Sequence, residues 1–92
     1  VTDNNNMNNT REQLPDWFDG MAYEIGDTVR NPFTEVEVEL DAAELSMYDL
    51  IKGAEVALHM GFGDQEDCLN IMQKGTSWFR SKNPEAYMDL LD

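Results

Sequence analysis

The chain has 92 residues, of which 19 are acidic and 6 are basic, so its formal net charge is −13 at neutral pH. This charge disfavours direct nucleic-acid binding, because a protein needs a basic surface to bind the phosphate backbone. The 41% hydrophobic content, with two Trp and four Phe, suffices for one small core and excludes complete disorder. No apolar run reaches the roughly 18 residues of a membrane span, and no secretory signal pattern is present. We therefore expect a cytoplasmic protein with one folded domain and no membrane partner.

The N-terminal segment differs in composition from the rest. Five of its first nine residues are Asn, and Met7 is its only long apolar side chain. Such a segment cannot bury enough apolar surface to offset the entropy of ordering. We predict a disordered Asn-rich arm over residues 1–13 and a single small α+β domain over residues 14–92.

An apolar cluster over residues 14–23 contains Trp17 and Phe18. The cluster is too short for a long helix, and two interpretations stay open. In the first, the rings cap the core of the following domain. In the second, the segment docks on a partner through Trp17 and Phe18, because aromatic anchors dominate the energetics of many interfaces.

A β-hairpin is predicted over residues 23–40. Residues 34–40 alternate polar and apolar side chains, which indicates a strand with one buried face at positions 36, 38 and 40. Residues 23–30 supply the partner strand, and Asn31 with the following proline marks the turn. An isolated pair of strands is only marginally stable, so the hairpin must pack on helices or on another chain. Its water-facing carboxylates are Glu35, Glu37 and Glu39.

A change to helical periodicity after the hairpin predicts three helices, over residues 42–60, 64–82 and 84–91. Asp41 and Glu44 have the spacing of a capping box at the start of the first helix, and Gly61 suits its C-terminus. The second helix begins with acids and ends with bases, which matches the helix dipole. Asn83, followed by proline, caps the short third helix. We expect the β-hairpin to pack on an antiparallel helical hairpin formed by the two long helices.

Gly53 and Gly75 lie inside the two long helices, where each costs about 1 kcal/mol relative to alanine. If the helical hairpin closes near Phe62, Gly53 lies opposite Met72 and Gly75 lies opposite Leu50. We expect both glycines to let the helices approach closely, with a hinge at Gly75 as the alternative.

Residues with catalytic or metal-binding chemistry are few, since the chain has one His and one Cys. Glu55 and His59 lie one helical turn apart, a spacing that can bind a divalent cation, but no second His completes a zinc motif. Cys68 could act as a nucleophile with His59 as its base. Its place on an apolar helix stripe is instead typical of a small buried side chain. We expect no catalytic residue, no metal site and no cofactor.

Four strings of the sequence carry a resemblance to a known group of proteins: Asn31-Pro32-Phe33-Thr34, residues 41–55, Gly75 to Arg80, and Asn83 to Met88. They resemble small uncharacterised acidic proteins of marine tailed phages, cyanophages among them, and the similarity covers residues 31–92. These proteins have no agreed function. The resemblance therefore implies a context only: synthesis in a bacterial host cytoplasm, with action on the host or a minor role in the virion. The Asn-rich arm has no counterpart in it.

The number of aromatic residues is large for so small a core, which favours a non-enzymatic protein–protein interaction module that binds a host or phage protein and self-associates as a homo-oligomer. One alternative is an acidic nucleic-acid mimic that blocks a DNA- or RNA-binding protein, with the acids of residues 35–55 on one continuous face. Another is a minor virion or assembly component. The residues expected to contact the partner are Trp17, Phe18, Glu35, Glu37, Glu39, Trp78 and Phe79.

Overall fold

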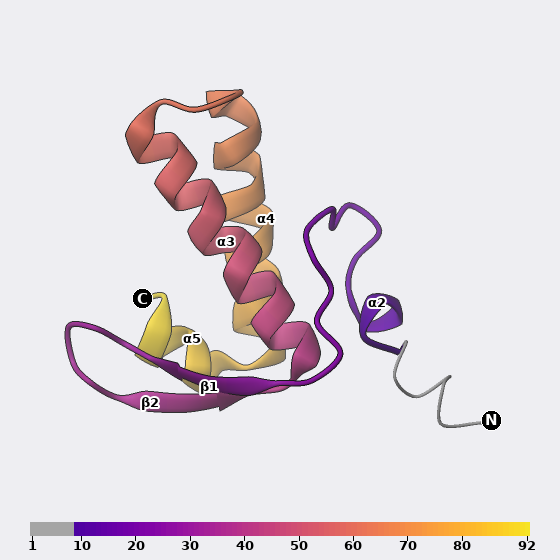
Figure 1. Ribbon diagram of the computed structural model, residues 1–92, viewed down its shortest axis with the longest axis vertical. Coiled ribbons are helices and arrows are strands. Elements are labelled where there is room, and N and C mark those ends of the chain that lie inside the picture. Colours follow the sequence, from indigo (N-terminus) through magenta and orange to yellow (C-terminus); the bar gives the residue numbers. More distant parts are fainter. Residues whose placement is uncertain (1–8) are drawn as a thin grey trace.

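The computed structural model describes residues 9–92, which adopt an α+β fold (Figure 1). In chain order the elements are α2 (Asn9–Gln13), β1 (Asp27–Arg30), β2 (Glu37–Leu40), α3 (Ala42–Met60), α4 (Gln65–Lys82) and α5 (Pro84–Leu90). The helices α3 and α4 form an antiparallel hairpin, and the two strands lie across its base beside α5. This arrangement confirms the predicted fold class, the helical hairpin and the short C-terminal helix.

Local capping signals determine where the helices begin. At the start of α3, Asp41 Oδ1 accepts the N–H of Glu44 at 2.8 Å, and Glu44 Oε1 accepts the N–H of Asp41 at 2.9 Å. The carboxylate of Asp64 accepts two amides of the first turn of α4, and the Asn83 side chain accepts one from α5. These bonds satisfy amides that have no partner inside the helix. The capping box predicted for α3 is therefore confirmed, with both of its bonds present.

The strands β1 and β2 pair antiparallel, with Val29 opposite Val38. Leu40 lies on the same face of the pair and is buried, and β2 contacts both α3 and α5. Glu37 and Glu39 point to water, as predicted. The hairpin therefore packs on helices, which supplies the buried surface that two strands alone lack.

Both strands are shorter than the sequence pattern predicts, and β2 begins late because the loop before it has its own hydrogen bonds. The Asn31 side chain accepts the N–H groups of Phe33 and Thr34 at 2.8 and 3.3 Å. Glu35 follows in the left-handed region, with φ of 67°. Such side-chain to backbone bonds compete with a strand ladder. Consequently Glu35 lies in the loop rather than on the strand, and Val36 is 41% exposed instead of buried in the core.

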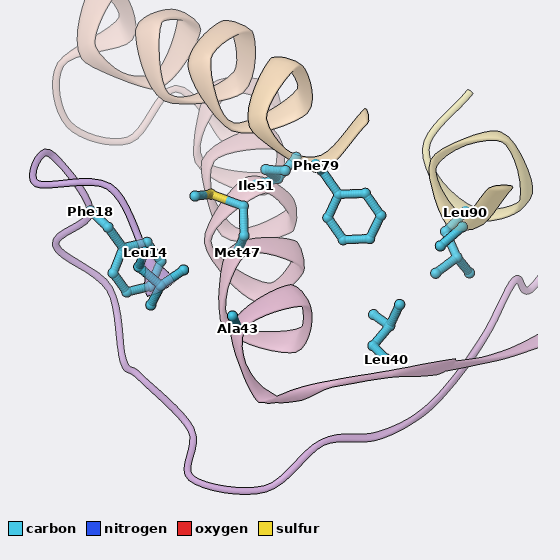
Figure 2. Close-up of a cluster of buried hydrophobic side chains, with 9 residues drawn as sticks. Leu14, Phe18, Leu40, Ala43, Met47, Ile51, Phe79 and Leu90 are labelled. Carbon is cyan, nitrogen blue, oxygen red and sulfur yellow. The ribbon is translucent and has the colours of Figure 1, made fainter. Parts of the chain in front are cut away.

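The core lies at the base of the helical hairpin, where all the larger elements converge (Figure 2). Phe79 of α4 and Met47 of α3 have no exposed surface and stand at its centre. The other buried members are Leu14, Phe18, Leu40, Ala43, Ile51, Ala86 and Leu90. Because these residues come from segments far apart in the sequence, the core joins the N-terminal segment, the sheet and α5 to the helical hairpin.

The N-terminal segment departs from the prediction of a disordered arm over residues 1–13. Residues 1–8 lie outside the described residues, but residues 9–13 form α2, which contacts α3 and buries Thr10. The chain then buries Leu14 and Phe18 in the core. An apolar anchor directly after the polar segment therefore orders its last residues, an effect that composition alone does not reveal.

The two helix glycines have different explanations. A Cβ at Gly75 would lie 2.7 Å from Cγ1 of Ile51 and 3.4 Å from Sδ of Met47, so close packing of α3 and α4 requires glycine there. The nearest partner is one residue from the predicted Leu50. At Gly53 a Cβ would meet no heavy atom within 4 Å. The packing explanation is therefore wrong for Gly53, and no contact of the described residues accounts for it.

Candidate protein-binding surface

The structure brings Trp17 and Trp78 together at one surface, although 60 positions separate them in the sequence. They line a shallow, open hollow of about 530 Å³. Both side chains are half-buried and also pack against the edge of the core. We name this surface the tryptophan face and define it by its lining residues, Trp17, Gln73, Lys74, Ser77, Trp78 and Ser81.

Buried neighbours hold the two tryptophans in place. The Phe18 N–H donates to the Pro15 carbonyl at 3.0 Å, which forms a tight turn around Trp17. In this turn Phe18 enters the core while Trp17 stays at the surface. On α4, successive residues point about 100° apart, so Phe79 fills the core while Trp78 faces outward. In both pairs of adjacent aromatic residues, the phenylalanine lies in the core and the tryptophan lies at the surface.

The tryptophan face lacks carboxylates, which is unusual in a chain with 19 acids. Lys74 Nζ lies 5.8 Å from the centroid of the Trp17 ring, and Lys82 Nζ lies 5.9 Å from that of Trp78. These distances are within the range of cation–π attraction. A face of aromatic rings, hydroxyls and lysine therefore interrupts an otherwise acidic surface.

Four members of this face were not expected from the sequence: Gln73, Lys74, Ser77 and Ser81. A signal was available, because residues 68–84 contain no Asp or Glu at all. Positions 74, 77, 78 and 81 also recur at the spacing of one helix face. Only the contact with Trp17, however, distinguishes this face of α4 from an ordinary solvated one.

The prediction that Phe18 and Phe79 contact a partner is wrong. Phe18 is 5% exposed and Phe79 is 0% exposed, so neither can touch a partner while the domain is folded. Both belong to the buried core cluster instead, together with Met47 and Ile51 of α3.

The three predicted glutamates of the β-hairpin are exposed but lie apart from the tryptophan face. None of the residues that line that face comes from the hairpin. Glu37 and Glu39 occupy the water-facing side of β2, and the Glu35 carboxylate pairs with Arg30 at 3.3 Å. The predicted contact residues therefore divide among the tryptophan face, the hairpin and the core.

The acids of residues 35–55 do not form a continuous face of free charges. Glu44 is buried, and its carboxylate accepts hydrogen bonds from Lys82 and the Asn83 side chain at 3.2 and 3.1 Å. Glu55 pairs with Lys52 at 3.0 Å. Helix capping and ion pairing thus occupy carboxylates that a nucleic-acid mimic would present at phosphate-like intervals. This geometry does not favour the mimic.

A network of charged groups joins the start of α3 to the end of α4. Lys82 Nζ lies 2.7 Å from Asp41 Oδ2 and 3.2 Å from Glu44 Oε2. Burial favours the neutral form of Asp41, but the hydrogen bond and charge of Lys82 and the backbone amides outweigh it, so the pKa of Asp41 is lowered. Burial likewise favours neutral Lys82, but its hydrogen bonds to the two carboxylates prevail, and the pKa of Lys82 is raised. Both shifts favour the charged pair.

Substituting Lys82 by Met should lower the free energy of unfolding by about 2 kcal/mol at neutral pH, because the buried Glu44 carboxylate loses a charged donor. The contribution of Asp41 is present above its unfolded pKa of about 3.9 and is lost as pH falls through its lower folded value. The contribution of Lys82 is present below about pH 10.4 and is lost as pH rises through its higher folded value. Urea unfolding of both proteins across pH tests this.

The control for this experiment is Lys74→Met, which removes the same charge from a lysine whose described contact is a tryptophan ring. We expect its unfolding free energy to stay closer to that of the unsubstituted protein, as for an exposed charge. A difference between the Lys82→Met variant and the unsubstituted protein that stayed constant from pH 2 to pH 11 would contradict the role of the ion pairs.

The residues considered for metal or nucleophilic chemistry do not assemble into a site in the part of the chain that the structure describes. The carboxylate of Glu55 is engaged by Lys52, and His59 is exposed at the end of α3. Cys68 is buried in α4, as expected for a small apolar side chain. Among residues 9–92, no group of three or more His, Cys, Asp or Glu side chains is placed to hold a metal ion.

None of the helices in residues 9–92 combines the length and the apolar character that crossing a membrane requires. Comparison with protein-family models, with curated proteins and with solved structures finds no match to this chain.

Proposed function

We propose that the protein is a non-enzymatic interaction module that binds another protein through the tryptophan face. The observation that carries this proposal is the meeting of Trp17 and Trp78 beside Lys74 on a surface without carboxylates. Tryptophan is enriched among the residues that dominate binding energy at protein interfaces. The two rings are held by buried neighbours, so little conformational entropy is lost when a partner covers them.

The charge distribution supports this assignment. An interface centre is depleted in charged residues, because a buried carboxylate without a partner is costly to desolvate. The residues that line the tryptophan face include no carboxylate, although the chain has a net charge of −13, and Lys74 is the one charged side chain among them. Its serine hydroxyls and the Gln73 amide can form hydrogen bonds at the rim, while the surrounding acids limit non-specific contact by repelling acidic proteins.

The biological context of the proposal comes from the resemblance to small proteins of tailed phages. In this context the module is phage-encoded, acts in the host cytoplasm without a cofactor, and binds a host or phage protein. There are two structural alternatives: self-association through the tryptophan face, and a place in the virion. The crosslinking experiment below distinguishes them from binding to a host protein.

The test uses a photo-crosslinking amino acid introduced at Ser77, in the tryptophan face, in the tagged protein. Lysate of the cell that makes the protein is irradiated at low and at high salt. The matched control carries the same amino acid at Thr28, which is exposed on β1. We expect a specific adduct from position 77 that is absent from position 28 and whose yield does not fall when the lysate is irradiated at high salt, because apolar contacts are not screened. An adduct with a second copy or a capsid protein would identify the structural alternatives.

A quantitative test follows once the crosslinked protein is known. Ser77→Arg places a large charged side chain in the hollow and should weaken binding by about a hundredfold, whereas Thr28→Arg, with the same change of charge, should leave affinity within about threefold. Adducts formed mainly from position 28 with a nucleic-acid-binding protein, in a yield that falls when the lysate is irradiated at moderate salt, would contradict the proposal and favour the mimic.

A further inference from the structure

Half of the side chains that line the tryptophan face can only donate hydrogen bonds. The indole groups of Trp17 and Trp78 and the ammonium group of Lys74 are donors without acceptor capacity. No carboxylate lines the face, and no ion pair within residues 9–92 includes Lys74. The serine hydroxyls and the Gln73 amide add further donors. The face is therefore complementary to a partner segment that offers many acceptors and few donors.

The tryptophan face extends along a short stretch of α4. Its members on this helix run from Gln73 to Ser81, which spans about 12 Å at 1.5 Å per residue. Lys74 Nζ lies 5.8 Å from the centroid of the Trp17 ring, and Trp78 follows one turn further along the helix. A polyproline II segment rises about 3.1 Å per residue, so about four of its residues cover this length.

The free backbone groups of a partner segment distinguish the possible occupants. An α-helix satisfies its carbonyls internally, so only its side chains can reach the donors of the face. Strand addition requires an open sheet edge, whereas the tryptophan face consists of side chains from a helix and a turn. A polyproline II segment has no internal hydrogen bonds, so its carbonyls stay free, and each of its prolines lacks an N–H. Segments of this kind bind aromatic-lined surfaces.

We propose that the tryptophan face binds a proline-rich segment of the partner in the polyproline II conformation, an inference that rests on the proposed function. Proline rings would lie against Trp17 and Trp78, and the carbonyls would accept hydrogen bonds from the donors of the face. An acidic residue of the segment would pair with Lys74, the one charged side chain in the lining. A segment made mostly of proline is otherwise uncharged, so the net charge of −13 repels it little.

Intrinsic fluorescence measures this binding directly, because the chain contains two tryptophans and both line the face. The probe is a synthetic peptide of about ten residues, all proline except for one central glutamate. The control peptide keeps the glutamate and replaces the prolines by glycine and serine, which form a flexible coil. We expect the proline peptide to bind at least about tenfold more tightly, because less conformational entropy is lost. Equal affinity for both peptides would overturn the proposal.

Two substitutions of equal charge locate the binding of the proline peptide. Ser77→Arg fills the hollow and should raise the dissociation constant by about tenfold or more. Thr28→Arg, on the exposed side of β1, should change it by less than about twofold. Circular dichroism checks that both variants keep their helical content. Undiminished binding by a folded Ser77→Arg variant would place the peptide elsewhere and overturn the proposal.

The pairing with Lys74 has its own matched substitutions. Lys74→Met should weaken binding of the glutamate peptide by about threefold, and binding of a peptide with glutamine in its place by less. The control is Lys52→Met, since Lys52 Nζ also lies near a ring, 6.0 Å from the centroid of Tyr48, but outside the tryptophan face. Equal weakening by the two substitutions would show attraction by overall charge and overturn the pairing.

The crosslinking experiment separates failure of this inference from failure of the proposed function. An adduct from position 77 that maps to a proline-rich segment of the captured protein would support both. An adduct that maps to a helical segment, or to one without proline, would overturn the polyproline II inference and leave the proposed function standing. The absence of both an adduct from position 77 and peptide binding would overturn both.

Discussion

Substituting Phe79 by alanine should lower the free energy of unfolding by about 3 to 5 kcal/mol. The Phe79 ring is fully buried at the centre of the core, between Met47 of α3 and Leu90 of α5 (Figure 2). Removing it deletes apolar contacts and leaves a cavity that rigid helices cannot fill completely. A domain of 92 residues has a free energy of unfolding of about 5 to 14 kcal/mol, so the Phe79→Ala substitution removes a large part of it.

Urea denaturation followed by tryptophan fluorescence measures this effect, because Trp78 adjoins the substituted position. The control is Phe33→Ala, which removes the same ring from a site that is 93% exposed and should change stability by no more than about 0.5 kcal/mol. An equally small effect of Phe79→Ala would contradict the assignment of Phe79 to the core. It would also restore Phe79 as a candidate contact residue.

Substituting Gly26 by alanine should lower the free energy of unfolding by about 3 kcal/mol, or prevent folding. A Cβ at this position would overlap the carbonyl oxygen of Leu40 and lie 2.8 Å from Cα of Asp41. These atoms belong to the backbone where β2 passes into α3, so no rotation of a side chain relieves the clash. The strands would have to separate from the start of α3, and overpacking of this kind costs about 1 to 3 kcal/mol or more.

The control for Gly26 is Gly53→Ala, in the open middle of α3. A methyl group there meets no atom within 4 Å, and alanine favours the helix, so stability should rise by about 1 kcal/mol. The two substitutions are chemically identical and should have opposite signs in thermal unfolding. A Gly26→Ala variant within about 1 kcal/mol of the unsubstituted protein would show that the approach of β1 to Leu40 is not required.

The helices were predictable because their signals are local. The Asp41 and Glu44 capping box, the acids after Asp64, and Asn83 before its proline act on amides within four residues, so the sequence order alone defines them. The antiparallel arrangement of α3 and α4 follows from the short turn at Phe62. The strand boundaries were less predictable, because the Asn31 side chain forms loop bonds that replace part of the predicted ladder.

The candidate site was only half predictable. Trp17 and Trp78 were expected to contact a partner, but their neighbours Phe18 and Phe79 were expected to do so as well, and these are buried. Adjacent aromatic residues have the same hydrophobicity, so composition does not distinguish them. The direction in which each ring points depends on where the opposing helix or turn leaves space, and this is a property of the assembled fold.

The glycines also show that equivalent sequence positions can differ in the folded protein. Gly53 and Gly75 look equivalent in the sequence, because each follows a lysine in the interior of a long helix. Their packing differs because Gly75 faces Ile51 across the hairpin whereas Gly53 faces solvent. Gly26 carried no signal of its importance, since its contact is with residues fourteen and fifteen positions away.

Residue order and composition are enough to predict the α+β class, the three main helices with their caps, and the excess of negative charge. These properties arise from local hydrogen bonds, from periodicity and from composition, which need no distant partner. The tertiary structure decided which aromatic rings are buried, brought Trp17 to Trp78, and engaged Glu44 with Lys82. The physical reason is that burial and pairing are set by contacts between segments far apart in the chain, which a sequence pattern does not contain.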